Sequence, residues 1–154
     1  MSDIRPADPQ APDMAPLLRA HLEHSWTATP QTSNHTMDAQ ALAEPGIAFF
    51  ALYENGEVLA CGALKSLDDG TAEVKSVHVV ERARGRGLAR RIMAHLDAVA
   101  RDRGHSALVL ETGADHLPEY AAARALYERL GYEYCSPIPG YGPDPNSAFM
   151  RLDL

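Results

Sequence analysis

The stretch from Arg82 to Ala89 (Arg-Ala-Arg-Gly-Arg-Gly-Leu-Ala) combines residue types that bind phosphate groups. It joins a predicted strand to a predicted helix, whose first turn leaves several backbone N–H groups without intrahelical partners. Two glycines allow a ligand to approach the backbone closely, while the helix dipole and three arginines supply positive charge. The pattern predicts a phosphate or pyrophosphate site, with a tight turn carrying solvated arginines as the alternative.

Other phosphate loops fit this stretch less well. A P-loop requires Lys-Ser/Thr after its second glycine, and the dinucleotide fingerprint requires a third glycine. Arg82-x-x-Gly85-x-Gly87 instead resembles the acetyl-CoA pyrophosphate signature of the GNAT acetyltransferases. A second motif, Ala123-Arg-Ala-Leu-Tyr-Glu-Arg-Leu-Gly-Tyr132, is similar to a later helix of the same family and the strand that follows it.

The resemblance covers roughly residues 46–135. It implies a central mixed sheet that splays between its fourth and fifth strands, with the pantetheine arm of acetyl-CoA, the co-substrate, in the gap. The residues it implies at the cofactor are Val77, His78, Val79, Arg82, Arg84, Gly85, Arg86, Gly87, Leu88, Ala89 and Tyr120. Tyr120 is a departure, because the family often has Asn three residues before the alanine that is Ala123 here. The hydrogen bond that Asn makes to the pantetheine arm is therefore either lost here or replaced by one from the phenol.

Two residues are candidates for acid–base catalysis. Tyr127 stands where many members of the family place a general acid for the departing thiolate, since a phenol can protonate a sulfur that becomes negative. Glu73 opens the fourth strand and could accept a proton from an amine, directly or through water. The alternatives are a core aromatic at 127 and a solvated Glu73–Lys75 surface pair.

Strand alternation predicts that Glu73, Lys75, Val77 and Val79 share one face of the strand. His78 then lies on the opposite face, where a structural role is expected.

The seven histidines do not form a metal site, because no HxxxH, HExxH or Cys/His pattern occurs. No nucleophile elbow and no Cys–His arrangement supports covalent catalysis. Direct attack of the acceptor on acetyl-CoA in a ternary complex therefore suits the sequence best.

By resemblance, residues 24–38 and 137–147 wall the acceptor site. The side chains there most able to bind a ligand are Trp26, His35, Tyr141 and Asp144, with ordinary loop packing as the alternative. The expected acceptor is a primary amine of a small molecule or peptide, and the acidic chain favours a cationic one. A non-catalytic acyl-CoA-binding regulatory module is the alternative function, and a homodimer follows only from family habit.

The composition limits the class of protein. The 154 residues suit a single domain, 1–154, and the net charge of −7 argues against nucleic-acid binding. No apolar run could span a membrane and residues 1–6 lack the basic-then-apolar pattern of a signal peptide, so a cytoplasmic protein is expected. Cys61 and Cys135 are both predicted to be buried, reduced thiols.

The elements that must position these residues follow from hydrophobic periodicity and turn signals. Helices are predicted over roughly 11–25, from Asp38 to about 43, over 88–100 before Gly104, and from Pro118 to Gly131, with a loop over 27–37. Strands are predicted over 47–53, 58–65, 71–80, 106–111, 132–136 and 148–152, with a hairpin turn at Asn55-Gly56. The sum is an α+β fold, a mixed and mostly antiparallel central sheet flanked by helices.

Overall fold

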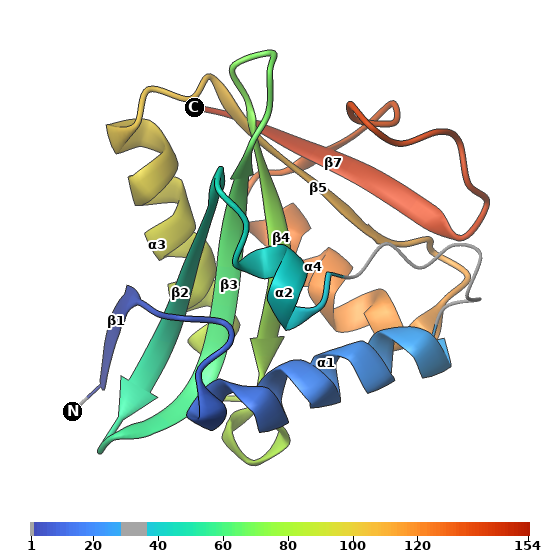
Figure 1. Ribbon diagram of the computed structural model, residues 1–154. Coiled ribbons are helices and arrows are strands. Elements are labelled where there is room, and N and C mark those ends of the chain that lie inside the picture. The colour runs from blue at the N-terminus through green and yellow to red at the C-terminus, as the bar shows by residue number, and fades with distance from the viewer. Residues whose placement is uncertain (1, 29–36) are drawn as a thin grey trace.

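The computed structural model describes residues 2–28 and 37–154, and for residues 25–28 it describes only the backbone. Within this part of the chain a seven-stranded sheet has the order β1-β2-β3-β4-β5-β7-β6 (Figure 1). All neighbouring strands are antiparallel except β4 and β5, which are parallel. The predicted α+β fold with a mixed, mostly antiparallel sheet is confirmed.

The strands are β1 (Ser2–Pro6), β2 (Ile47–Glu54), β3 (Glu57–Ser66), β4 (Ala72–Val79), β5 (Ala107–Gly113), β6 (Glu133–Cys135) and β7 (Ser147–Asp153). The α-helices are α1 (Ala15–Ala28), α2 (Ala39–Leu42), α3 (Leu88–Asp102) and α4 (Ala121–Arg129), and the 3-10 turns are η1 (Pro12–Met14), η3 (Glu81–Ala83) and η4 (Pro118–Tyr120). Each predicted element is present with small boundary shifts. The predicted loop over 27–37 is only partly described, and its first two residues belong to α1.

Strand β1, like the short turn η3, is not predicted from the sequence. It pairs antiparallel with β2, from Ser2 opposite Glu54 to Pro6 opposite Phe50. Its short, proline-ended sequence carries little periodic signal, because an edge strand buries few side chains and tolerates proline. The β2 partner supplies the order that the local sequence does not specify.

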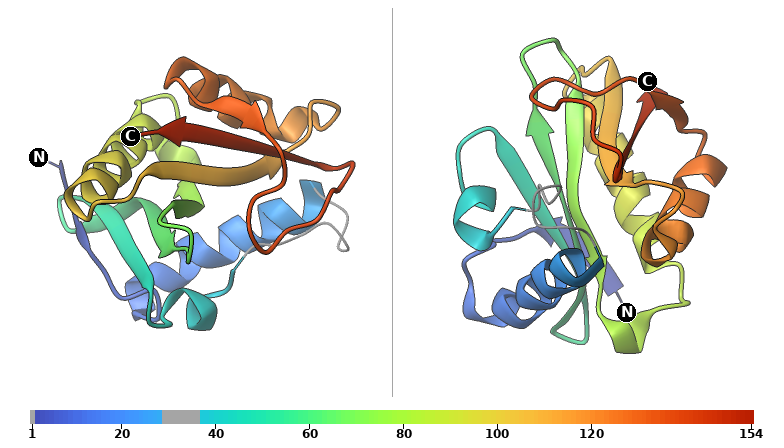
Figure 2. Two further views of the ribbon diagram at one scale, coloured as in Figure 1. Left: turned by 90° about the horizontal axis from the view of Figure 1, so that it is seen from above. Right: turned by 90° about the vertical axis from the view of Figure 1, so that its right-hand side faces the viewer.

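Helices cover both faces of the sheet, as the edge-on view in Figure 2 shows. One face packs against α3, where Ile92, Met93 and Leu96 are almost completely buried. The other face packs against η1, α1 and α2, whose buried side chains in this second cluster are Met14, Leu17, Leu18 and Leu42. The periodic apolar residues of α3 and α1 therefore hold these helices on opposite sides of the sheet.

Strands β4 and β5 pair over only two positions and then separate. The paired positions are Ala72 with Leu108 and Glu73 with Val109. Beyond Glu73, β5 pairs along its whole length with β7, so one side of β4 faces a gap (Figure 1). Backbone N–H and C=O groups that have no sheet partner at such a gap can bind a ligand in an extended conformation.

A β-bulge lies in the part of β4 that borders the gap. Cys61 pairs with His78 and Ala63 with Lys75, so two residues of β4, Ser76 and Val77, oppose one residue of β3. Ser76 adopts a left-handed conformation with φ of 56°. An extra residue in one strand reverses the alternation of the side chains that follow it.

The predicted alternation of β4 is therefore wrong beyond Lys75. Val77 and Val79 pack in the core beneath α3, together with Val74. His78 instead points to the α1 side, where its ring contacts His21. Glu73 and Lys75 are also on that side, and both contact Tyr141. The bulge thus places one imidazole and two charged groups of β4 on one surface.

The prediction for the two cysteines is half correct. Cys61 is buried, whereas Cys135, in the edge strand β6, is exposed, and both are free thiols. The apolar neighbours of Cys135 do not bury it, because β6 contacts only β7 in the sheet. No helix of the described residues is long and apolar enough to cross a membrane.

Candidate active site

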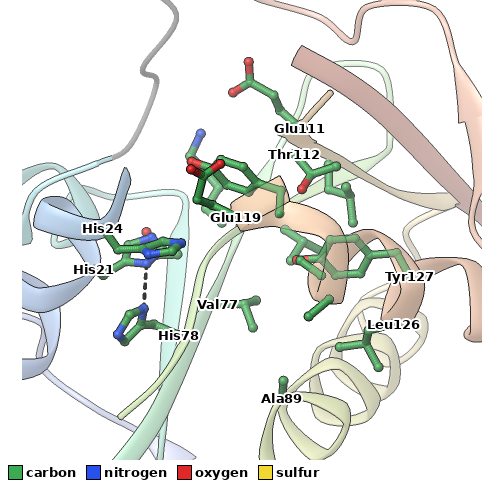
Figure 3. Close-up of a pocket in the computed structure, with 18 of the residues that line it drawn as sticks. His21, His24, Val77, His78, Ala89, Glu111, Thr112, Glu119, Leu126 and Tyr127 are labelled. Atoms are coloured by element: carbon green, nitrogen blue, oxygen red, sulfur yellow. Dashed lines mark hydrogen bonds between the residues drawn. The ribbon is translucent and has the colours of Figure 1, made fainter. Parts of the chain in front are cut away.

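A pocket of about 410 Å³ opens where β4 and β5 separate (Figure 3). Its walls come from α1, β4, the first turn of α3, β5, η4, α4 and the start of β7. The sequence-predicted site residues that line it are Glu73, Val77, His78, Val79, Arg84, Ala89, Tyr120 and Tyr127. The structure thus brings both acid–base candidates to one cavity.

The remaining predicted residues lie just outside the pocket lining, in the turn that enters α3. Gly87 is the N-cap of the helix with φ of 75°, in the left-handed region, and no side chain caps the helix. Gly85 has φ of 79°. Glycine adopts this conformation without the strain that a Cβ introduces. The first N–H groups of α3 therefore have no side-chain cap that would compete with an anion.

The arginines of this turn are not equivalent. Arg82 forms an exposed ion pair with Glu57 (2.7 Å) and Arg86 forms one with Glu54 (2.5 Å). Arg84 donates from Nε to the backbone oxygen of Val79 (3.2 Å) and also lines the pocket. The side chain of Leu88 is buried in the core, so only its backbone is available to a ligand.

Tyr127 extends from α4 toward the gap between β4 and β5 (Figure 3). Its ring packs partly against the main core, with the ring of Tyr132 5.9 Å away. Burial raises the pKa of Tyr127 to about 12, because the phenolate is poorly solvated there. The residue therefore combines the predicted core contact with access to the pocket, and its hydroxyl keeps its proton at neutral pH.

Tyr120 lies at the start of α4 and packs over the backbone of Gly113. A Cβ at position 113 would come within 2.1 Å of the Tyr120 ring, so only glycine fits beneath it. The ring of His24 in α1 lies 5.9 Å from that of Tyr120. The phenol thus occupies a defined place in the pocket wall between α1 and α4.

Arg124 lies within the second motif, although the sequence predicts no role for its side chain. Its side chain is buried and donates to four backbone oxygens of the segment that connects β5 to α4: those of Gly113, Ala114, Asp115 and Leu117. Buried hydrogen bonds from a charged donor are among the stronger ones. Arg124 therefore fixes the segment that carries Tyr120. Its neighbours in sequence give no sign of this role.

Glu73, Lys75 and Tyr141 form a closed cluster at the end of the gap where β4 still pairs with β5. Oε2 of Glu73 accepts hydrogen bonds from the ammonium of Lys75 (3.0 Å) and from the hydroxyl of Tyr141 (2.6 Å). Lys75 also donates to the Tyr141 oxygen (2.7 Å). Burial and the Glu73 carboxylate both raise the pKa of Tyr141. The Glu73–Lys75 pair is nine-tenths buried and is not a solvated surface pair.

A second side-chain contact, between His21 of α1 and His78 of β4, forms another wall. The two Nδ1 atoms are 3.0 Å apart and the rings meet edge to face (Figure 3). Burial is the main cause that lowers the pKa of His21 to about 4 and that of His78 to about 3, and the nearby Arg84 lowers that of His78 further. Both rings are therefore neutral at pH 7. His21 was not predicted, since a single histidine on an amphipathic helix carries no sequence signal.

The four acceptor-site candidates have different outcomes. Tyr141 contacts the pocket-lining residues Glu73 and Lys75. Asp144 accepts a hydrogen bond from the Asn146 backbone (2.9 Å) and so shapes the turn before β7. The side chain of Trp26 and all of His35 lie outside the described residues. Within the described ranges, no group of His, Cys, Asp and Glu side chains is arranged to hold a metal ion.

Comparison with known proteins identifies one family. The model of the acetyltransferase (GNAT) family matches residues 12–132. This range includes α1, the bulged strand β4, the glycine–arginine turn and all of α4.

Individual relatives agree with the family match. The chain is 42% identical over 127 residues to the IAA acetyltransferase of Azospirillum brasilense, covering 81% of this chain and 80% of the relative. It is 37% identical over 138 residues to the uncharacterized N-acetyltransferase YsnE of Bacillus subtilis, covering 90% of each chain. A solved Klebsiella pneumoniae structure, described as a candidate acyl-CoA N-acyltransferase, superimposes with a TM-score of 0.78 at 33% identity, covering 100% of this chain and 98% of that one.

Proposed function

Because the chain belongs to the acetyltransferase (GNAT) family and is an acetyl-CoA-dependent N-acetyltransferase, we propose that it acetylates a primary amine by direct attack in a ternary complex. The observation that carries the proposal is that Glu73 and Tyr127 line one pocket, at the gap between β4 and β5. A non-catalytic regulatory module, the alternative raised by the sequence, has no support from these relatives.

The residues around the gap fit acetyl-CoA by their chemistry. The start of α3 has no side-chain cap, so its N–H groups suit the pyrophosphate. The edge of β4 formed by Val77, His78 and Val79 has no β5 partner, so its backbone suits the amides of the pantetheine arm. Arg84 adds a positive charge at the same opening. When bound, acetyl-CoA supplies an acetyl thioester to this pocket.

Tyr127 is proposed as the general acid. When the C–S bond breaks, the sulfur takes up the electron pair and needs a proton or a strong hydrogen bond. A buried phenol with a raised pKa stays protonated until a stronger base, the thiolate, forms beside it. Its position on the α4 wall of the pocket supports this role.

Glu73 is proposed as the group that receives the proton of the incoming ammonium. Its Oε2 is already hydrogen-bonded to Lys75 and Tyr141, whereas no described residue donates to Oε1. The carboxylate can therefore bind a water or the ammonium through Oε1 while the cluster holds it in place. Glu111 and Glu119 also line the pocket, and this excess of carboxylates supports a cationic amine acceptor.

The test is a screen of amines with acetyl-CoA, following release of the free thiol. The amines are amino acids, polyamines, aminoglycosides and peptide N-termini, and IAA, after which the Azospirillum brasilense relative is named, is tested beside them. Acetylation of a primary amine supports the proposal, and cationic amines are expected to be the better acceptors. The proposal would be contradicted if no amine released the thiol faster than hydrolysis by water alone does.

A further inference from the structure

The side chains of His21 and His78 have no role in the proposed transfer, although both residues line the pocket. His78 follows the bulge directly, and the bulge turns its ring to the α1 face while its neighbours Val77 and Val79 point to the α3 core. His21 reaches it from α1, so the two Nδ1 atoms meet at 3.0 Å. Without the bulge, strand alternation would place the ring of residue 78 on the other face.

The contact fixes the protonation of the two rings. Since both are neutral, one Nδ1 must carry a hydrogen and donate it, and the other Nδ1 must accept. Each neutral ring carries only one hydrogen on its two nitrogens, so the donating ring has a lone pair on Nε2 and the accepting ring has a hydrogen on Nε2. No described residue hydrogen-bonds to either Nε2. The pair therefore has one basic end and one acidic end.

The surroundings of the pair disfavour a lasting charge on either ring. The titratable and charged groups that face it are His24 on α1, Arg84 in the turn before α3, and the Cys61 thiol on β3, which donates to the Ser76 oxygen. None of these is an anion that would stabilise an imidazolium. When the ring with the Nε2 lone pair binds a proton, it becomes positively charged. It loses this charge by donating its Nδ1 hydrogen to the second ring, which then releases its own Nε2 hydrogen.

Acetylation of an amine requires two proton losses from nitrogen, and only the first is assigned to Glu73. The ammonium must first become a free amine. When that nitrogen bonds to the thioester carbon it becomes positively charged again, and a second N–H bond must break before the amide is complete. This second proton is more acidic than that of an ordinary ammonium, so a weak base is sufficient to accept it.

We propose that the His21–His78 pair is the relay that accepts this second proton. The N–H bond of the intermediate breaks and the proton binds Nε2 of the first ring. The Nδ1 hydrogen crosses to the second ring, and the Nε2 hydrogen of that ring passes to water. The C–S electron pair leaves with the sulfur, which Tyr127 protonates. Water then returns a proton to the Tyr127 phenolate, and proton exchange with water returns each ring to its original tautomer. The step rests on the proposed direct attack of an amine.

The first experiment determines the protonation state and tautomer of His21 and His78 in the absence of any acceptor amine. Long-range proton–nitrogen NMR spectra of the ¹⁵N-histidine-labelled wild-type protein at pH 7 report the tautomer of each ring, with the His21→Asn and His78→Asn variants providing the assignments. Two neutral rings of opposite tautomers are expected. A charged ring, or two rings of the same tautomer, would overturn the relay.

The second experiment measures turnover with an amine found by the screen. His21→Asn and His78→Asn each keep a hydrogen-bonding group near the position of Nδ1 but remove the relay, so kcat should fall by about 10²-fold, the low end of general-base effects, with coenzyme A affinity retained. His78→Ala should regain activity when imidazole is added. The matched control is His95→Asn, since His95 is a histidine packed on Phe50 outside this pocket, and its kcat should stay at the wild-type value.

The outcomes separate the two proposals. Wild-type kcat in the His21 and His78 variants, or a loss in His78→Ala that imidazole does not recover, would overturn the relay and leave the acetyltransferase mechanism in place. A wild-type enzyme that acetylates no primary amine would instead overturn the proposed function, whatever the tautomers of the pair.

Discussion

At the scale of the residue, the hydroxyl of Tyr127 is the atom on which the proposed chemistry depends most. Tyr127→Phe keeps the ring that packs against the core and removes only the proton donor. We expect kcat to fall by about 10²–10⁴-fold while the affinity for acetyl-CoA is retained, because the proton is needed only as the thiolate leaves. Steady-state kinetics and the melting temperature of one preparation measure both effects.

Tyr132→Phe is the matched control for this change. The Tyr132 hydroxyl is also buried, near Tyr127, but has no hydrogen-bond partner among the described residues and does not line the pocket. Its removal should leave kcat unchanged and the stability equal or slightly higher. Full activity in Tyr127→Phe would contradict the assignment of the acid.

Glu73 combines a proposed catalytic role with a buried ion pair, so its substitution should change two quantities. Glu73→Gln removes the base, and kcat should fall near neutral pH and recover at high pH, where the amine is already free. The same change leaves the Lys75 ammonium nine-tenths buried without its carboxylate, which should cost about 3–5 kcal/mol of unfolding free energy. A pH–rate profile and a denaturant titration measure these effects separately.

The double variant Glu73→Gln, Lys75→Met distinguishes catalysis from stability. It removes the isolated charge, so much of the lost stability should return while the rate defect remains. If the pH–rate profile of Glu73→Gln has the wild-type shape, Glu73 is not the base.

At the scale of the element, the start of α3 is expected to bind the pyrophosphate through its backbone. Gly87→Asp should weaken coenzyme A binding by at least roughly tenfold, about 1.4 kcal/mol, because it introduces a carboxylate at the phosphate site. Open space surrounds the position, since an added Cβ would meet no atom within 4 Å, so the fold should persist. Calorimetric titration with coenzyme A provides the measurement.

Gly87→Asn serves as the control, because Asn has the same size as Asp and tolerates a φ of 75° equally well but carries no charge. It should bind coenzyme A more tightly than the Asp variant does. Equal affinity in the two variants would mean that the phosphate does not lie at this helix terminus.

At the scale of the whole molecule, the neutral histidine pair makes stability depend on pH. The folded-state pKa of His21, about 4, lies below the ordinary histidine pKa of 6.5, so the unfolded chain binds more protons between these values. The contribution of His21 to stability is complete above pH 6.5 and is lost as the pH falls toward 4. Near pH 5 the loss is about 2 kcal/mol, or roughly 4–8 °C in Tm.

Thermal melts at several pH values test this prediction. The Tm of His21→Asn should fall less than that of the wild type between pH 7 and 5. His116→Asn, which changes an exposed histidine, should keep the wild-type slope. A wild-type slope in His21→Asn would contradict the lowered pKa.

The sequence alone determined the family and, except for β1 and η3, the order of the elements. These features are local: the glycine–arginine turn, the helix stops at Gly104 and Gly131 and the hairpin turn at Asn55-Gly56 each lie within a few consecutive residues. In the structure Asn55 and Gly56 both have positive φ, and both helices are followed by a glycine of positive φ, as the turn chemistry predicts.

The tertiary structure decided which side chains meet on the α1 side of the pocket. The bulge opposite Gly62 moved His78 to the α1 face, and no periodicity in the β4 sequence indicates a single inserted residue. The contacts of Tyr141 with Glu73 and of His21 with His78 join residues 68 and 57 positions apart. Such contacts depend on the register of strands and on helix packing, which arise from burial over the whole chain and not from neighbouring residues.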